Sequence, residues 1–149
     1  MIKFTYYGEI KGKGRPRFRN TGKFIQTYTD SKTRDYEMSL KEAYLQANQE
    51  SYMNPETPLE LTLVVYQEIP KSTSKKKAKE MLDGYIRPTK KPDADNIIKS
   101  VLDSLNKVAF YDDTQFIAIH VWKYYDIKPC LKVRIEEFKK EDLELWVKE

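Results

Sequence analysis

Two aspartates stand one residue apart in the segment KPDADNIIKSVLDSL at residues 91–105. They are Asp93 and Asp95, and Lys99 follows four residues after the second. Neighbouring carboxylates bind hard divalent cations such as Mg²⁺, which also take water and phosphate oxygens as ligands. A lysine one helical turn away can offset the repulsion between the carboxylates or stabilise negative charge on a phosphate. These residue types therefore predict metal-assisted hydrolysis of a phosphodiester.

A simpler interpretation makes the same acids part of an ordinary helix terminus. An aspartate at the N-cap position accepts hydrogen bonds from free amides of the first turn and contributes about 1 kcal/mol. Acids are also favoured by the positive end of the helix dipole. Asp95, Lys99 and Asp103 are spaced four residues apart, so the lysine can form surface ion pairs on one helix face.

A second acidic pair favours the metal site. Asp112 and Asp113 end the connection that leaves the same predicted helix, and we expect them to return to its N-terminal end. Neighbours in an extended segment point to opposite sides, so one of the two is expected to be a ligand. Asp113 has the same two-residue period as Ile117 and Ile119, which are predicted to face inward. This periodicity favours Asp113 as the ligand and Asp112 as a supporting residue, and the choice between the two acids stays open.

The elements around these acids follow from hydrophobic periodicity. Strands are predicted at 2–7, 24–28, 59–67, 116–125 and 130–138, and helices at 31–50, 72–84 and 95–106. The last two strands are expected to pair with each other. Because strands and helices interleave without regular βαβ spacing, the predicted fold class is α+β. We expect a single compact domain over residues 1–149, with a mixed sheet, flanking helices and an acidic tail at 139–149.

Composition excludes several classes of protein. No stretch approaches the roughly 18–20 apolar residues of a membrane span, and the N-terminus alternates instead of forming a signal-peptide core. A cytoplasmic protein without membrane contact is expected. Cys130 is the only cysteine, which excludes a disulfide framework and a cysteine zinc site. His120 is the only histidine, and we expect it to be packed within its apolar strand.

The net charge of +4 is unevenly distributed. Residues 1–36 carry nine Lys and Arg against three acids, and residues 71–91 carry eight against two. Two basic blocks around a carboxylate cluster predict a polyanionic partner. The side chains expected to contact its phosphates are Lys13, Arg15, Arg17, Arg19, Lys75, Lys76, Lys77, Lys90 and Lys91.

The segment KPDADNIIKSVLDSLN, followed by FYDDTQ, resembles the RusA family of Holliday-junction resolvases. The family signature is Asp-x-Asp-Asn-x-x-Lys-x-x-x-Asp and then an Asp-Asp pair. GKGRPRF, YTD and IPKSTSKKK are also similar to that family, and the resemblance extends to about residue 137. It implies a RusA-like fold and a homodimeric, Mg²⁺-dependent endonuclease. Such an enzyme resolves four-way DNA junctions by paired symmetric nicks in DNA recombination and repair.

The resemblance also implies roles for particular residues. The predicted catalytic residues are Asp93, Asp95, Lys99 and Asp113, of which the three acids bind Mg²⁺; Asn96, Asp103 and Asp112 support them.

Most of the eleven tyrosines are expected in the core. Phe18 and Tyr28 are exceptions, since an aromatic at a loop tip can wedge into the open centre of a junction. Two alternatives remain: a flap or fork nuclease of the same chemistry, and a non-catalytic protein that binds branched DNA.

Overall fold

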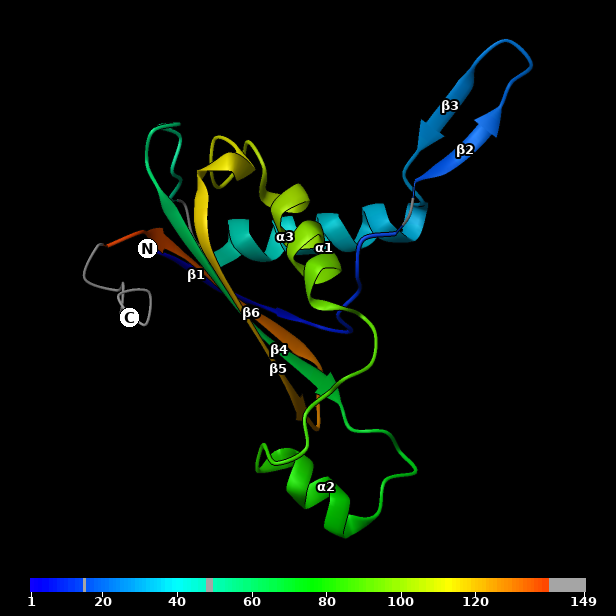
Figure 1. The fold of residues 1–149 in the computed structure, drawn as a ribbon, viewed down its shortest axis with the longest axis vertical. Coiled ribbons are helices and arrows are strands. Elements are labelled where there is room, and N and C mark those ends of the chain that lie inside the picture. Colours follow the sequence, from blue (N-terminus) through cyan, green and yellow to red (C-terminus); the bar gives the residue numbers. More distant parts are fainter. Residues whose placement is uncertain (15, 48–49, 140–149) are drawn as a thin grey trace, which may run out of the picture.

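The computed structural model describes residues 1–14, 16–47 and 50–139 (Figure 1). The elements are β1 (Ile2–Tyr7), β2 (Arg17–Asn20), β3 (Ile25–Tyr28), α1 (Ser31–Ala47), β4 (Leu59–Glu68), α2 (Lys75–Leu82), α3 (Ala94–Leu105), the 3-10 helix η1 (Asp113–Gln115), β5 (Phe116–Asp126) and β6 (Cys130–Glu137). All the predicted strands and helices are present. Strand β2 was not predicted, because its segment has the glycines, proline and charge of a loop. The predicted contact of Arg15 and the acidic tail from residue 140 onward lie outside the described residues.

The main sheet has the strand order β1-β6-β4-β5. Strands β4 and β5 are parallel, while β6 is antiparallel to both β1 and β4, so the sheet is mixed and the α+β fold class is confirmed. The predicted pairing of β5 with β6 is wrong, because β4 lies between them. The short link at residues 127–129 crosses the end of β4, where the Ile69 amide donates to the Asp126 carbonyl at 3.1 Å.

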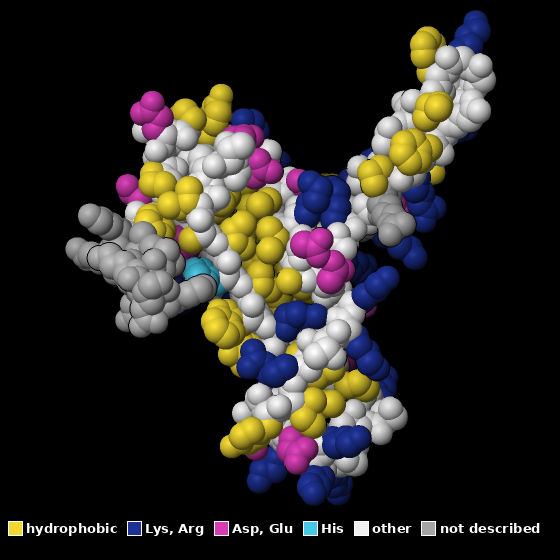
Figure 2. Space-filling view, in the orientation of Figure 1, with side chains coloured by type: hydrophobic (Ala, Val, Ile, Leu, Met, Phe, Trp, Pro, Cys, Tyr) yellow, Lys and Arg dark blue, Asp and Glu magenta, His cyan; other side chains and the backbone are white. Residues whose placement is uncertain are grey.

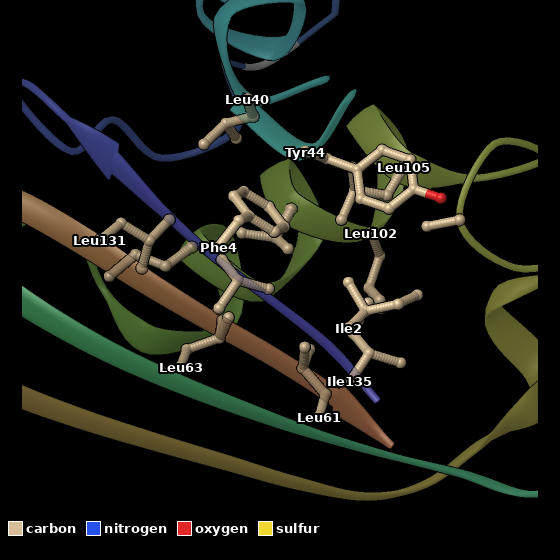
Figure 3. Close-up of a cluster of buried hydrophobic side chains, with 14 of the residues drawn as sticks. Ile2, Phe4, Leu40, Tyr44, Leu61, Leu63, Leu102, Leu105, Leu131 and Ile135 are labelled. Atoms are coloured by element: carbon tan, nitrogen blue, oxygen red, sulfur yellow. The ribbon is translucent and has the colours of Figure 1, made fainter. Parts of the chain in front are cut away.

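One face of the sheet carries the hydrophobic core, and helices α1 and α3 cover that face (Figures 1 and 3). Alternate residues of the strands point toward the helices, including Leu61 and Leu63 of β4, which are fully buried. Tyr44 of α1 and Leu105 of α3 meet them from the other side (Figure 3). Burying such a side chain stabilises the fold by about 1.5–3 kcal/mol. Because one stripe of α3 is buried, the opposite face of the helix, which carries Asp95, Lys99 and Asp103, points outward.

Strand β5 lies at the edge of the sheet, which corrects two expectations. Ile119 and Val121 pair with Leu61 and Leu63, so they point to the helix-covered side as predicted. At the edge that cover is incomplete, and Ile117 and Ile119 are exposed. His120 points to the opposite, open side of the sheet, where it is exposed and its Nε2 lies 3.0 Å from Glu60 Oε1. The expectation that His120 is packed is therefore wrong.

Two parts extend away from the body of the domain, namely the β2–β3 hairpin and helix α2 (Figure 1). Helix α2 begins after Ser74, whose hydroxyl accepts a hydrogen bond from the Lys77 amide at 3.4 Å. It ends before Gly84, which has a φ of +82°. In the described ranges, no helix combines the length and apolar character needed to cross a bilayer.

Candidate active site

Asp93 and Asp95 lie at the N-terminal end of α3. Asp93 occupies the N-cap position with an extended backbone, yet its carboxylate makes no hydrogen bond to the first-turn amides. Instead, Asn96 Nδ2 donates to Asp93 Oδ1 at 2.8 Å. The side chain is therefore oriented by another side chain and does not cap the helix, which disfavours the simpler interpretation for this residue. Asn96 thus makes the contact that a supporting role requires, and the role itself stays a prediction.

The two carboxylates lie close enough to influence each other's protonation. A hydrogen bond with Asp95, followed by one with Asn96, lowers the pKa of the Asp93 carboxyl. The same contact with Asp93 raises the pKa of Asp95. Both side chains are exposed, so incoming groups can reach them. Two neighbouring carboxylates offer only oxygen ligands and carry negative charge, and such ligands suit a hard cation. Mg²⁺ commonly binds one or two carboxylates together with water and phosphate oxygens.

The basic segment before the acids is held through its backbone. Lys123 Nζ on β5 donates to the carbonyls of Lys90 and Pro92 at 2.8 and 3.0 Å. Gln67 Nε2 on β4 donates to the Lys91 carbonyl at 3.1 Å. Because the strands hold only backbone atoms, the side chains of Lys90 and Lys91 stay exposed beside Asp93. Sequence reasoning missed Gln67 and Lys123, since nothing in their strands marks them as positioning residues.

The loop after β1 packs against the first turn of α3. The Lys13 amide donates to the Asn96 carbonyl at 3.2 Å, and Ser100 Oγ donates to the Lys11 carbonyl at 3.4 Å. A Cβ on Gly12 would lie 3.0 Å from the Cβ of Asn96 and 3.3 Å from that of Pro92. Residues 9–13, residues 91–93 and Asn96 thereby line one open groove. Gly12 is thus a second residue that the sequence did not mark.

Replacing Gly12 with valine should displace Asn96 and, through it, the Asp93 carboxylate. If the predicted DNA-nicking activity depends on these acids, Gly12→Val should lower its rate by about 10- to 100-fold, the usual effect of disturbing residues that orient metal ligands. The melting temperature and the affinity for DNA should change little, because the groove is open. Single-turnover nicking rates, measured beside both controls, check this. A variant with the wild-type rate would show that the close approach of Gly12 does not position the acids.

Lys99 lies on the outer face of α3 and is mostly exposed. Its Nζ is 3.7 Å from Asp103 Oδ1, and the role of Asp103 in orienting this lysine stays a prediction. Asp103 Oδ2 also lies 2.9 Å from Lys13 Nζ, and Lys13 forms a second ion pair with Glu37 of α1. Lys13 was predicted to contact DNA phosphates. Two carboxylates engage its ammonium group, so we treat it as a structural link between the loop, α1 and α3.

The two ion pairs of Lys13 are expected to contribute measurably to the stability of the fold. Burial lowers the pKa of its ammonium group, but hydrogen bonds to Glu37 and Asp103 outweigh burial and raise it above 10.5. Lys13→Gln should reduce the free energy of unfolding by about 1–3 kcal/mol, because two carboxylates lose their shared partner. Since the folded pKa is raised, this contribution is complete below pH 10.5 and is lost as the pH rises through the folded value.

Urea denaturation of wild type and Lys13→Gln at several pH values tests this, with Lys41→Gln on the exposed face of α1 as the matched control. The difference between wild type and Lys13→Gln should be constant from about pH 7 to 9 and shrink above about pH 10.5. Equal stability of the two variants at neutral pH would contradict a structural role for Lys13.

Asp112 and Asp113 have different environments. Thr114 Oγ1 donates to Asp112 Oδ2 at 2.7 Å, and Lys107 Nζ lies 3.7 Å from Asp112 Oδ1. The hydrogen bond from Thr114 is the main reason that the pKa of Asp112 is lowered. The Asp113 carboxylate is exposed and has no hydrogen-bond or ion-pair partner among the described residues. Of the two acids, Asp113 is therefore the one that is free to bind a ligand.

The Asp112 and Asp113 pair does not return to the N-terminal end of α3, and that expectation is wrong. The pair follows the C-terminal end of α3, whereas Asp93 precedes its first residue (Figure 1). Helix α3, which lies between Asp93 and the Asp112 and Asp113 pair in the chain, has 12 residues and is about 18 Å long. Across the described ranges, no three Asp, Glu, His or Cys side chains form a group that could hold a metal ion.

The residues predicted to contact phosphate lie on both sides of the acid pair. Arg17 and Arg19 are exposed on β2, and Lys75, Lys76 and Lys77 are exposed in the first turn of α2. Figure 2 shows Lys and Arg side chains gathered from the base of the hairpin down to α2, along the side where the basic segment runs. A polyanion that follows this surface passes the N-terminal end of α3.

An exposed carboxylate pair flanked by extended basic elements defines a candidate nuclease. The sequence matches the family described as "Endodeoxyribonuclease RusA" over residues 8–136. The chain therefore belongs to the RusA family, whose members are crossover junction endodeoxyribonucleases that depend on divalent metals. It is also 35% identical over 138 residues to "Uncharacterized protein YqaN" of Bacillus subtilis (strain 168), a match that spans 91% of this chain and 96% of YqaN.

Proposed function

We propose that this protein is a Mg²⁺-dependent endonuclease that resolves Holliday junctions by paired symmetric nicks, in DNA recombination and repair. The observation that carries the proposal is the exposed pair Asp93 and Asp95, held at the start of α3 beside the lysines of residues 90–91. Family membership supplies the reaction class. The geometry supports assigning the reaction to this end of α3.

The residues at this end of α3 have separate roles in the proposed hydrolysis. Asp93 and Asp95 would hold the divalent cation, and the chemistry that the cation would supply when bound is activation of a water and neutralisation of charge on the scissile phosphate. Asn96 keeps the Asp93 carboxylate oriented through its hydrogen bond. Free amides at the start of α3 and the positive end of its dipole attract the phosphate. Lys99, held by Asp103, stabilises the negative charge that develops in the transition state.

We propose that Asp113, the third acid, serves the site of a partner subunit in a homodimer. Asp93 and Asp113 lie beyond opposite ends of α3, a helix about 18 Å long. Because metal–carboxylate distances are about 2 Å, one chain does not bring both acids to one ion. A two-fold axis allows each subunit to donate Asp113 to the other's Asp93 and Asp95, which completes two identical sites. Two sites related by such an axis also suit two nicks in strands of like polarity.

An apolar surface beside Asp113 supports this dimer. Ile117 is 59% exposed and Ile119 is 39% exposed, and Tyr111 is 46% exposed on the other side of the acid. Figure 2 shows hydrophobic side chains gathered between β5 and α3. Burial of such a surface against a second copy removes apolar area from water and would place both copies of Asp113 at the interface.

Nicking of a synthetic mobile four-way junction tests the function. Linear duplex and flap substrates are run beside it, with Mg²⁺ and with EDTA. The proposal predicts nicks in the junction at symmetric positions that disappear in EDTA. Equal cutting of the flap would instead indicate a general flap or fork nuclease. Binding to the junction without nicks at any metal concentration would leave a non-catalytic branched-DNA-binding protein.

A further inference from the structure

The β2–β3 hairpin, residues 17–28, forms an arm that stands away from the domain (Figure 1). Every residue of both strands is exposed, and the two strands contact each other far more than any other element. An isolated two-stranded hairpin is at best marginally stable in water. Its tip is nevertheless well formed, since the Thr21 amide donates to the Phe24 carbonyl at 3.1 Å and Gly22 adopts a φ of +81°.

The strand register gives the arm two different faces. Arg17 pairs with Tyr28 and Arg19 with Gln26, so these four side chains share a polar, basic face. Phe18 pairs with Thr27 and Asn20 with Ile25, which places Phe18 and Ile25 on the opposite face. Phe18 is 72% exposed, Ile25 is 74% exposed, and Phe24 at the tip is 78% exposed. Tyr28, grouped with Phe18 in the sequence analysis, therefore belongs to the arginine face.

Charge and position point to DNA as the partner of this arm. Residues 10–29 contain no acid, and the arm itself carries Arg17, Arg19 and Lys23. A second copy of the arm would be repelled, whereas phosphates are attracted. The segment that leads into the arm is fixed to the site through the hydrogen bond from the Lys13 amide to the Asn96 carbonyl. The base of the arm therefore lies near the carboxylates, and DNA that binds along the arm can extend to them.

We propose that the apolar face of this arm stacks on the base pairs exposed at a DNA branch point and so gives the enzyme its preference for branched substrates. The inference rests on the proposed function and specifies how that function selects its substrate. Apolar wedges inserted into intact duplex must first unstack a base step. At a branch point, that stacking is already interrupted. Phe18, Ile25 and Phe24 thus favour the branch point, while Arg17 and Arg19 bind phosphates of any DNA.

The test compares two sets of arm variants with wild type in the presence of Ca²⁺ or EDTA, so that binding is measured without cleavage. Phe18→Ala combined with Ile25→Ala should lower the affinity ratio of junction to duplex by about 10-fold or more, since each stacked base contributes that order of affinity. Arg17→Gln combined with Arg19→Gln should weaken binding to both DNAs alike and reduce the salt slope by about two. Met38→Ala, an exposed apolar residue on α1, is the matched control.

A second readout reports the contact itself. With 2-aminopurine placed at the branch point, wild type and Met38→Ala should change its fluorescence on binding, and the Phe18→Ala, Ile25→Ala variant should not. An unchanged affinity ratio and fluorescence signal in that variant would overturn the inference. Loss of the dimer in sedimentation would also overturn it, because the arm would then bind a second copy.

The result for wild type separates this inference from the proposed function. If wild type nicks junctions and the arm variants keep their junction preference, only the inference is overturned. If wild type shows no preference for the junction, the proposed function and the inference are both overturned.

Discussion

Asp93→Asn should abolish nicking of a four-way junction while leaving junction binding unchanged or tighter. Asparagine has almost the same shape, and its side-chain oxygen can still accept the hydrogen bond from Asn96. It lacks the negative charge that binds a divalent cation, and one anion fewer faces the DNA phosphates. We expect the single-turnover rate to fall by about 10²- to 10³-fold, the order seen when a group that stabilises transition-state charge is removed.

Asp35→Asn is the matched control, because Asp35 is an exposed aspartate on α1, an element outside the acid pair. Both variants should melt at the wild-type temperature, since neither carboxylate is buried. If Asp93→Asn kept even a tenth of the wild-type rate with Mg²⁺, Asp93 would be a surface residue of the helix terminus, as in the simpler interpretation of the sequence.

Mixing two inactive variants should restore activity. In a homodimer with composite sites, Asp93→Asn spoils the site on its own subunit and Asp113→Asn spoils the site on its partner. A mixed dimer of the two therefore contains one site with both changes and one site with none. At equal mixing about half of the dimers are mixed, so nicking should recover to about a quarter of the wild-type level.

A second mixture and one further variant distinguish a site shared by two subunits from a site built by one subunit. Asp93→Asn mixed with Asp95→Asn should stay inactive, because both changes fall on the same side of every composite site. Asp112→Asn should keep most of its activity, since Asp112 is engaged by Thr114 and Lys107. Failure of the first mixture to regain activity, with subunit exchange verified by a size tag, would contradict donation of Asp113 across the dimer.

The sequence predicted the elements of this fold well, because amphipathic strands and helices leave a clear periodicity. It could not predict the order of strands in the sheet. The link of residues 127–129 is short enough for a hairpin, yet β4 lies between β5 and β6. The inserted strand β4 is fully buried on its core face, at Leu59, Leu61, Leu63 and Val65. Spacing along the chain contains no such information.

The candidate site was predictable where it is local in sequence. Asp93, Asp95, Asn96 and Lys99 lie within two turns, so a short motif defines their relative positions. Long-range relations were not predictable. Asp113 lies beyond the far end of α3, and Gly12 reaches Asn96 from another part of the chain. Lys13 belongs to a basic segment of the kind that contacts DNA, but in the fold its ammonium group forms ion pairs with Glu37 and Asp103.

Cleavage of a supercoiled plasmid that extrudes a cruciform shows whether this enzyme resolves four-way junctions by two coordinated nicks. Two nicks made within one binding event produce linear plasmid, whereas a single nick relaxes the plasmid, and the cruciform is reabsorbed. With Mg²⁺, wild type should give linear plasmid as the main early product, and with EDTA it should give no product. Accumulation of nicked circles without linear plasmid, or no cleavage at all, would contradict resolution by two coordinated nicks.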